Sequence, residues 1–267
     1  MFDLSGSLAV VTGALGRLGP IWVEALLEAG ASVAALDLPN AQVSQRFRDV
    51  SGRADGDRLR RFDCDITSRT SIESARDAIV ATSGSPTVLV NNAGIDQPPD
   101  VPSDRHTIDV LPVERFRRMV DVNLTGTFQV TQVFGGMMAE RQQGVVVNIG
   151  SLYASVSPDQ RFYDHLPGDP PFLKTPAYGA SKAAVVNLTR YFATLWGAQG
   201  VRVNTLSPGG VLDKQDATFL GKYGERVPLG RLAEAEDLKG PLVFLASAAS
   251  SYVTGIELRV DGGFTAW

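Results

Sequence analysis

Apolar runs of strand length alternate with segments of helical periodicity along the chain. Residues 8–11 form an unbroken apolar run, which is typical of a strand buried on both faces in a parallel sheet. Comparable runs predict further strands at residues 32–36, 59–62, 87–90, 144–151, 201–206 and 256–260. No internal repeat or break in composition interrupts the alternation. The pattern therefore predicts an α/β protein, a single doubly wound domain over residues 1–267 with a parallel seven-stranded sheet.

The segments between these runs predict the helices and loops. Helical patterns cover residues 20–30, 68–83, 113–141, 178–199 and 236–247. Thr67 or Ser68 can cap the second of them. Residues 39–57 fit an exposed helix plus loop, and residues 95–111 a loop rich in proline and aspartate in which His106 is exposed. From the sixth strand to about Arg231 the sequence predicts a mobile connection.

Composition narrows the class of protein. Hydrophobic residues make up 44% of the 267 residues and charged residues 20%, which is typical of a soluble globular enzyme. The net charge of -4 gives no reason to expect a nucleic-acid partner. A single cysteine, Cys64, and two histidines leave neither an internal disulfide nor a zinc site, so we expect no metal. The N-terminus is acidic and no apolar run could span a bilayer, which predicts a cytoplasmic protein without membrane contact.

A glycine-rich loop follows the first predicted strand. Residues 12–19 contain Gly13, Gly16 and Gly19 and lead into a helix, whose free N–H groups and positive dipole end make an anion site, usually for pyrophosphate. Asp37 lies eighteen positions after Gly19 (37 − 19), where a dinucleotide fold places the carboxylate that binds the adenosine ribose. That carboxylate would repel a 2′-phosphate, so NAD is favoured. Arg17 is the counter-signal for NADP, although it can equally serve the pyrophosphate or face solvent.

A tyrosine and a lysine share one face of the helix at residues 178–199. Tyr178 and Lys182 are four residues apart, so they lie one turn from each other. An ammonium at that distance favours the phenolate and lowers the tyrosine pKa from its reference of about 10, which suits general acid–base chemistry. Taken alone, this pair is also a common coincidence of helix packing.

Polar residues at three further positions add to this picture. Ser151 stands at the C-terminal end of a strand, the edge at which parallel sheets collect ligand and catalytic groups. Asn123 has low helix propensity, which indicates either a kinked turn that holds a water or a satisfied core amide. Asn91 and Asn92 end another strand and could tie neighbouring strands together.

In this order, the motifs at residues 12–19 and 91–94 with Asn123, Ser151, Tyr178 and Lys182 resemble the short-chain dehydrogenase/reductase superfamily. The resemblance covers nearly the whole chain and implies a Rossmann-type fold that binds NAD(P). It implies that Tyr178 is the acid–base and that Lys182 lowers its pKa and holds the nicotinamide ribose. It also implies that Ser151 steadies the substrate oxygen and that Asn123 holds a water linking Lys182 to solvent.

The same resemblance implies the residues that surround the cofactor. The pyrophosphate would meet the glycine loop, the adenine would meet Asp65 and Ile66, and the nicotinamide would lie against the turn that begins at Pro208. The full cofactor-binding set is Gly13, Gly16, Arg17, Leu18, Gly19, Asp37, Asp65, Ile66, Asn91, Ala93, Gly94, Tyr178, Lys182, Pro208, Gly209 and Val211.

Two departures from the family pattern leave alternatives open. The glycine rhythm is similar to that of the larger sugar epimerases and dehydratases, whereas classical members place the middle glycine where Arg17 stands. Those larger relatives carry an extra C-terminal substrate domain, and this chain ends soon after its last predicted strand. The oxidoreductase is therefore preferred, with an NAD-dependent epimerase or dehydratase as the alternative. Leu212 and Asp213 replace the family's frequent threonine, so the carboxamide contact stays open.

The second departure is the gap from Ser151 to Tyr178, which is twenty-seven positions long (178 − 151) and exceeds the usual family gap. Its excess predicts an active-site flap at about residues 152–176, rich in hydrogen-bonding groups. Such a flap favours a polar alcohol or ketone, such as a sugar, sugar acid or polyol, over a steroid or fatty chain. The alternative is that the segment only contacts a neighbouring subunit.

Two further alternatives concern activity and assembly. A catalytically silent NAD-binding sensor would be marked by the loss of Tyr178, Lys182 or Ser151, and all three are present. The resemblance implies a homo-oligomer, commonly a homotetramer. Residues 242–246 and the terminal segment ending at Trp267 are candidate subunit contacts, or else ordinary core.

Overall fold

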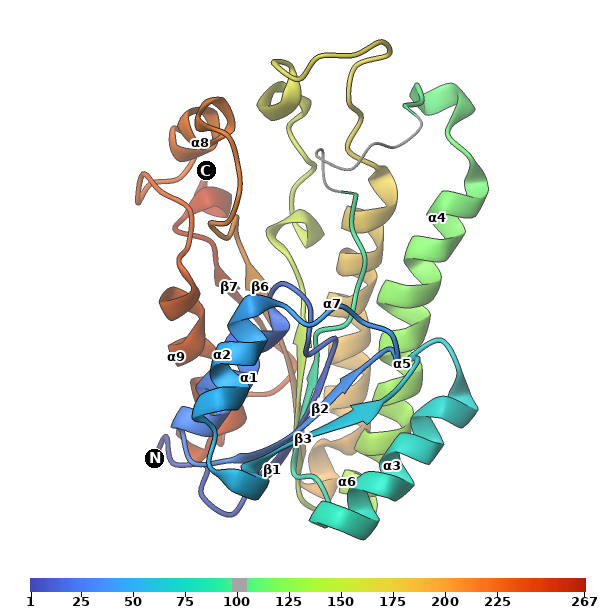
Figure 1. The fold of residues 1–267 in the computed structure, drawn as a ribbon, viewed down its shortest axis with the longest axis vertical. Coiled ribbons are helices and arrows are strands. Elements are labelled where there is room, and N and C mark those ends of the chain that lie inside the picture. Colours follow the sequence, from blue (N-terminus) through green and yellow to red (C-terminus); the bar gives the residue numbers. More distant parts are fainter. Residues whose placement is uncertain (98–104) are drawn as a thin grey trace.

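The computed structural model describes residues 1–97 and 105–267 as one parallel sheet covered by helices on both faces (Figure 1). The seven strands lie in the order β3-β2-β1-β4-β5-β6-β7, and each pairs in parallel with its neighbours, which confirms the predicted sheet. The strands are β1 (Leu8–Thr12), β2 (Ser32–Asp37), β3 (Leu59–Asp63), β4 (Val88–Asn91), β5 (Gly144–Ile149), β6 (Val201–Pro208) and β7 (Glu257–Val260).

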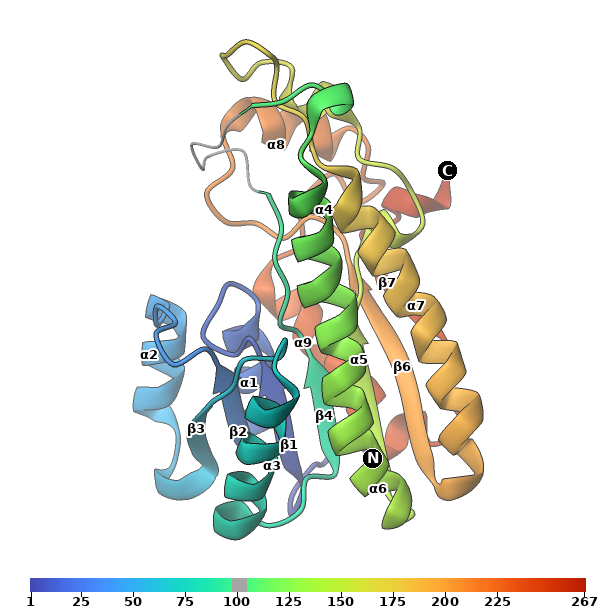
Figure 2. The same ribbon diagram turned by 90° about the vertical axis from the view of Figure 1, so that its right-hand side faces the viewer.

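The helices that cover the sheet form two layers, one on each side of it in Figure 1, and Figure 2 faces the layer that contains α5, α6 and α7. Buried side chains of α1, α2 and α9 pack on one face of the sheet, and those of α3, α6 and α7 pack on the other. The helices are α1 (Gly19–Glu28), α2 (Gln45–Arg53), α3 (Arg69–Ser83), α4 (Val113–Val120), α5 (Thr127–Val130), α6 (Gly136–Glu140), α7 (Pro176–Trp196), α8 (Ala217–Gly224) and α9 (Ala235–Ala246). Ser68 is the residue that caps α3, because its side chain accepts a hydrogen bond from the Ser71 amide. No helix in the described part of the chain has the length and apolarity to cross a membrane.

Burial on both faces explains the unbroken apolar run of β1. Successive strand residues point to opposite faces, so Ala9 and Val11 enter the core below α1 while Leu8 and Val10 enter the core below α3. All these side chains are buried. A strand with only one covered face would show alternation of apolar and polar residues instead.

A chain of buried polar side chains crosses the middle of the sheet. Asn91 of β4 lies opposite Asn148 of β5, which lies opposite Thr205 of β6. Asn91 Nδ2 donates to Asn148 Oδ1 at 2.8 Å, and Asn148 Nδ2 donates to Thr189 Oγ1 on α7 at 2.8 Å. The hydroxyls of Thr189 and Thr205 are 2.7 Å apart and complete the chain. Asn91 therefore has the strand-tying role that its position suggested.

The predicted helix at residues 113–141 is interrupted by wider turns. Two π-helical segments, Asp121–Gly126 and Thr131–Gly135, separate α4, α5 and α6. Thr127 Oγ1 donates to the Asn123 carbonyl at 2.8 Å, a local hydrogen bond that competes with regular helix geometry. Asn123 therefore lies in a π-helical turn rather than in a regular α-helix.

The stretch between β6 and Arg231 contains a helix, so the prediction of a mobile connection there is wrong. Asp216 caps α8 by accepting a hydrogen bond from the Phe219 amide at 2.9 Å. The helix is fixed from outside by aromatic side chains of a distant segment, because Phe162 and Tyr163 pack on Phe219 and Tyr223. His106 also differs from the prediction, since it is half-buried rather than exposed. Part of its loop, residues 98–104, lies outside the described residues.

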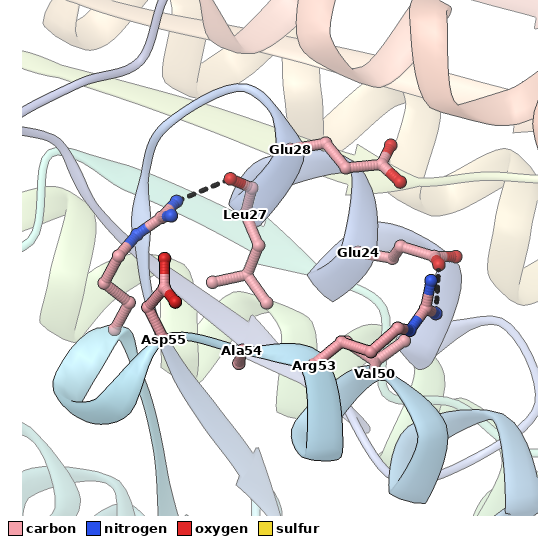
Figure 3. Close-up of a pocket in the computed structure, with 8 residues that line it drawn as sticks. Glu24, Leu27, Glu28, Val50, Arg53, Ala54 and Asp55 are labelled. Atoms are coloured by element: carbon pink, nitrogen blue, oxygen red, sulfur yellow. Dashed lines mark hydrogen bonds and ion pairs between the residues drawn. The ribbon is translucent and has the colours of Figure 1, made fainter.

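A small cavity of about 160 Å³ lies between α1 and α2 (Figure 3). Its charged lining groups already have partners, since Arg53 Nη2 donates to Glu24 Oε1 at 2.7 Å and Arg58 donates to the Leu27 and Ala31 carbonyls. This cavity contains none of the predicted site residues.

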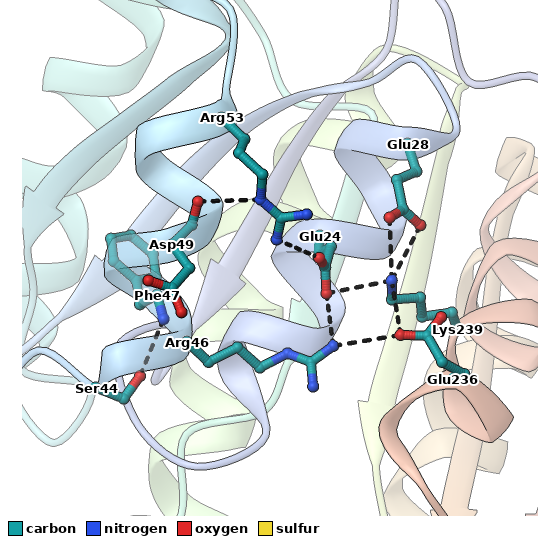
Figure 4. Close-up of polar contacts among 9 residues, drawn as sticks. All are labelled: Glu24, Glu28, Ser44, Arg46, Phe47, Asp49, Arg53, Glu236 and Lys239. Atoms are coloured by element: carbon teal, nitrogen blue, oxygen red, sulfur yellow. Dashed lines mark hydrogen bonds and ion pairs between the residues drawn. The ribbon is translucent and has the colours of Figure 1, made fainter.

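Glu24 holds three helices together through charged partners (Figure 4). It is 8% exposed and accepts hydrogen bonds from Arg46 of α2 at 2.6 Å and Arg53 of α2 at 2.7 Å, and Lys239 of α9 lies 3.2 Å away. Burial alone would raise the pKa of this carboxyl, but the hydrogen bonds from the three cations outweigh it and lower the pKa to about 2. The ionised form therefore stabilises the fold.

Glu24→Gln is expected to lower the free energy of unfolding at pH 7. The unfolded carboxyl has its ordinary pKa of 4.5 and the folded one about 2, so the stabilisation is complete above pH 4.5 and is lost as the pH falls toward 2. The shift corresponds to about 3 kcal/mol as an upper bound, because the arginines are partly exposed to solvent. Urea denaturation at pH 7 and pH 3 should show that the difference in the free energy of unfolding between variant and wild type shrinks at the lower pH.

The control Glu28→Gln, which removes an exposed carboxylate paired with Lys239, should cost less than about 1 kcal/mol. Equal losses for the two variants would contradict the prediction.

Candidate active site

A cleft of about 850 Å³ opens at the carboxyl ends of the strands, where parallel sheets bind their ligands. Most of the predicted site residues line it, and they come from the segments that follow β1 to β6 and from the start of α7. The predicted residues in its lining are Gly13, Gly16, Arg17, Leu18, Asp37, Asp65, Ile66, Ala93, Gly94, Ser151, Tyr178, Lys182, Pro208, Gly209 and Val211. Gly19, Asn91 and Asn123 lie outside the lining.

The glycine loop is held in a conformation that side chains would prevent. Gly13 has a φ of +62°, and a Cβ there would lie 2.7 Å from the Ala93 Cα. A Cβ on Gly19 would lie 2.3 Å from the Gly13 carbonyl oxygen, so this glycine serves the packing of the loop on the helix start. A Cβ on Gly16 would have no contact closer than 3.5 Å, so packing within the chain does not require a glycine there. The loop fits a pyrophosphate because its backbone can approach the cleft closely.

Asp37 stands at the end of β2 with its carboxylate turned to the glycine loop. Its Oδ2 accepts from the Leu15 amide at 2.9 Å, and its Oδ1 accepts from the Leu38 amide at 2.9 Å. Arg17 forms an ion pair with Asp213 at 3.0 Å, and both side chains are about half exposed. The one cation of the glycine loop thus already has a counter-charge within the chain.

The two adjacent asparagines take different positions. Asn91 is buried below the cleft, where its side chain donates to Thr131 and Asn148 and does not line the cleft. Asn92 lines the cleft instead, and its Nδ2 donates to the carbonyls of Thr12 at 3.0 Å and Gly13 at 2.9 Å. Strand alternation explains the difference, since neighbouring residues point to opposite faces. That alternation was the signal that could have selected Asn92 from the sequence.

Asn123 is a fully buried amide with partners on both sides. Its Oδ1 accepts from the Ile95 amide at 2.8 Å, and its Nδ2 donates to the Ile95 carbonyl at 2.9 Å. Nδ2 also lies 3.2 Å from the Ser181 hydroxyl. The side chain therefore fixes the segment that follows β4 against α7, and the satisfied core amide is the interpretation that its contacts support.

The pKa of Tyr178 shifts in the direction opposite to the prediction. Burial raises the pKa of the phenol above its ordinary value and the charge of Asp96 raises it further, while a hydrogen bond with Ser151 and the charge of Arg17 act to lower it. Lys182 does not reverse this, because its Nζ lies 5.8 Å from the Tyr178 ring centre and donates to the Ile149 carbonyl at 2.7 Å. The sequence pattern could not weigh the cost of burying a phenolate.

Burial also acts on Lys182, lowering its pKa to about 8, with Asp96 opposing the shift. A protonated phenol with a serine hydroxyl beside it is a proton donor for a carbonyl oxygen. In the opposite direction, the deprotonated phenol would accept the proton of an alcohol.

Several cleft residues were not singled out from the sequence. They come from the segment after β4, from the segment at residues 152–176 and from the start of α8. Those that bear hydrogen-bonding groups include Asp96, Tyr153, Lys174, Gln215 and Asp216, next to Tyr163 and His165 of the predicted flap. Lys174 lies before the first residue of α7, so the helical spacing of Tyr178 and Lys182 gave no signal for it.

The cleft suits a dinucleotide along its whole extent. It reaches from Asp37 past the glycine loop to Tyr178, and glycines keep its floor open. A Cβ on Gly94 would lie 3.1 Å from the buried Asn123 Oδ1, so this glycine serves the packing below the cleft. Within residues 1–97 and 105–267 no group of three or more His, Cys, Asp or Glu side chains could hold a metal ion.

Known proteins resemble this chain over nearly its full length. A family described as Enoyl-(Acyl carrier protein) reductase matches residues 14–265. The D-threitol dehydrogenase of Mycolicibacterium smegmatis is 35% identical over 99% of this chain and 95% of its own. The galactitol 2-dehydrogenase of Rhizobium johnstonii is also 35% identical, over 100% of this chain and 98% of its own.

Solved structures agree with the sequence relatives. A short-chain dehydrogenase from Leptospira borgpetersenii with bound NAD+ has a TM-score of 0.84 at 31% identity, covering 98% of this chain and 94% of its own. A gluconate 5-dehydrogenase from Burkholderia cenocepacia in complex with NADP and tartrate has a TM-score of 0.83 at 30% identity, covering 100% of this chain and 98% of its own. On these grounds the chain belongs to the short-chain dehydrogenase/reductase superfamily and is an NAD(P)-dependent alcohol dehydrogenase/reductase.

Proposed function

We propose that this enzyme interconverts a secondary alcohol and a ketone on a small polyhydroxylated substrate, with NAD as the preferred cofactor. The observation that carries the proposal is the meeting of Ser151, Tyr178 and Lys182 in one cleft with the glycine loop and Asp37. Relatives named for threitol, galactitol and gluconate support a polar substrate. They also align along 95% to 98% of their own length, which supports the dehydrogenase over the epimerase alternative.

The roles of the side chains follow from their positions. The nicotinamide cofactor, when bound, supplies the hydride chemistry. Tyr178 exchanges a proton with the substrate oxygen, and Ser151 steadies that oxygen because its hydroxyl bonds to the same phenol. Lys182 lies on the same helix one turn further on and would hold the nicotinamide ribose. Asn123 acts as a positioning residue, since it fixes Ile95 beside the cleft.

The preference for NAD rests on charge at the adenosine end. The Asp37 carboxylate faces the cleft, where it would accept hydrogen bonds from a ribose and repel a 2′-phosphate. Arg17 could compensate a phosphate, but it is paired with Asp213. Both features favour NAD. NADP remains the second cofactor that the same cleft could take, and the neighbouring structures include one with NAD+ and one with NADP.

Residues 152–176 act as an active-site flap within a single NAD(P)-binding domain that spans residues 1–267. Tyr153, Tyr163, His165 and Lys174 of this segment line the cleft, which supports the flap over a purely intersubunit role. Polar groups along the wall favour a substrate with several hydroxyls over a sterol or fatty chain.

A homotetramer in the cytoplasm remains the expectation from the family resemblance. Of the candidate contacts, Leu242 and Leu245 are fully buried within the chain and belong to its core, whereas Val243 and Phe244 are partly exposed. Trp267 is 72% exposed, and Tyr191 and Leu195 on α7 are also exposed, so these side chains could bury apolar surface between subunits. Light scattering would measure the oligomeric state.

The proposed function predicts that the purified enzyme reduces NAD when it is given a polyol. A panel of threitol, galactitol, gluconate and a sterol with NAD or NADP, followed by the absorbance of the reduced cofactor, tests this. Turnover of at least one of the polar substrates, and not of the sterol, with NAD is the expected result. Conversion of a sugar without net change in the cofactor would favour the epimerase alternative. Binding of NADH without any turnover would favour the silent sensor.

A further inference from the structure

An ion pair lies inside the cleft, next to the proposed acid–base. Lys174 Nζ donates to Asp96 Oδ2 at 2.5 Å and to the Gln97 carbonyl at 3.2 Å. The Lys174 side chain is only 5% exposed, whereas that of Asp96 is 38% exposed, and both residues line the cleft. The carboxylate of the pair is therefore the part most accessible to a ligand.

Both partners are held from behind by hydrogen bonds. The amide of Lys174 donates to Gln160 Oε1 at 3.0 Å, and the next residue, Thr175, caps α7. On the other side, Asn123 binds both the amide and the carbonyl of Ile95, the residue before Asp96. The flap and the segment after β4 thus meet at a fixed point, and the pair is preorganised rather than a chance surface contact.

The pair is adjacent to the reacting groups. Lys174 Nζ lies 5.6 Å from the centre of the Tyr178 ring, and Lys182 Nζ lies 5.8 Å from the same centre. Because Lys174 Nζ also holds Asp96 Oδ2 at 2.5 Å, the carboxylate lies in the same part of the cleft as the Tyr178 ring. A substrate whose oxygen meets Tyr178 would therefore bring its neighbouring carbon atoms toward Asp96 and Lys174.

The chemistry of the pair matches a second hydroxyl group. A carboxylate accepts hydrogen bonds at two oxygens, and an ammonium has three donors, of which two are used here. A hydroxyl can donate to the first and accept from the second. An apolar substituent would exclude water from both charged groups without offering a hydrogen bond in its place, which makes its binding unfavourable. A substrate carboxylate would meet Asp96, the more exposed partner, and be repelled by it.

We propose that Asp96 and Lys174 form a subsite that recognises the hydroxyl next to the reacting carbon of an uncharged polyol or ketose. The inference rests on the proposed function. It narrows the substrate class, because the subsite would select polyols over sugar acids and over simple alcohols.

The first test compares butane-2,3-diol with butan-2-ol, which lacks the second hydroxyl, with NAD at saturation. The wild type should have the higher kcat/KM for the diol. Lys174→Met combined with Asp96→Leu removes both charges and keeps the net charge, and should lower the diol-to-alcohol ratio of kcat/KM at least about tenfold, mostly through KM. A ratio that does not change while turnover persists would overturn the subsite and leave the proposed function standing. If the wild type oxidises no alcohol with either cofactor, the proposed function fails and the inference with it.

The second test changes one charge with little change in shape. Asp96→Asn should raise kcat/KM for threonate relative to threitol, because a substrate carboxylate no longer meets a like charge. Asp164→Asn is the matched control, since Asp164 pairs with Lys222 in the same region but does not line the cleft. It should leave both ratios unchanged. A threonate-to-threitol ratio that is the same in wild type and Asp96→Asn would contradict the proposal even if the double variant does not fold.

Discussion

Tyr178→Phe is expected to lower kcat at least ~10²-fold, the low end for the loss of a general acid–base. The substitution removes only the hydroxyl that bonds to Ser151 and leaves the ring beside Tyr153, so the shape of the cleft is kept. NADH binding should therefore survive. Steady-state rates on the best polyol, together with fluorescence titration of NADH, measure the two effects separately.

The matched control for this substitution is Tyr191→Phe. Tyr191 lies on the same helix, is 59% exposed and lies outside the cleft, so the same chemical change should leave turnover as it was. A Tyr178→Phe enzyme that retained most of its rate would show that another group transfers the proton. The assignment of Ser151 and Lys182 around it would then need to be replaced.

Asp37→Asn is expected to shift the cofactor preference toward NADP. Two like charges about 4 Å apart repel each other by roughly 4 kcal/mol near a protein surface, and the substitution removes this repulsion for a 2′-phosphate. Because solvent and salt screen part of it, the ratio of kcat/KM for NADP over NAD should rise at least about tenfold. The asparagine oxygen can still accept from Leu15 or Leu38, which limits distortion of the glycine loop.

Asp63→Asn is the control for the loss of a carboxylate. Asp63 lies opposite Asp37 on the neighbouring strand β3 but does not line the cleft. The same change of net charge at this position should leave the cofactor ratio nearly constant. A similar shift in both variants would mean that the overall field of the protein, and not contact at the ribose, sets the preference.

The sheet and most helices could be predicted because their physical signal is local. A strand that is buried on both faces appears in the sequence as an unbroken apolar run. The glycine loop before α1 marks where that helix begins. Helix α8 could not be predicted in this way. Its stability depends on Phe162 and Tyr163, which lie more than fifty residues earlier in the chain (219 − 162 = 57). A contact at that separation has no periodicity to reveal it.

In the active site, residue spacing predicted which side chains lie together, but not how their surroundings act on them. The spacing of Tyr178 and Lys182 predicted their shared face, but it could not predict that burial dominates the pKa of the phenol. The pairing of Arg17 with Asp213 joins two loops that are distant in sequence, and so do the contacts of Lys174 with Asp96. Charge compensation across a cleft is set by the fold, so it became visible only in three dimensions.

The polar chain from Asn91 through Asn148 to Thr205 also fixes how the central strands align. If β5 shifted by one residue against β4, the side-chain amides of Asn91 and Asn148 would point to opposite faces of the sheet. Their hydrogen bond would be broken, and both amides would be left in an apolar interior. Each orphaned group would cost about 1 to 3 kcal/mol. Mispaired sheets are thus penalised at the very strands whose ends carry Ser151 and the segment with Asp96. The alignment of β4 and β5 therefore also fixes where Ser151 and the segment with Asp96 stand relative to each other.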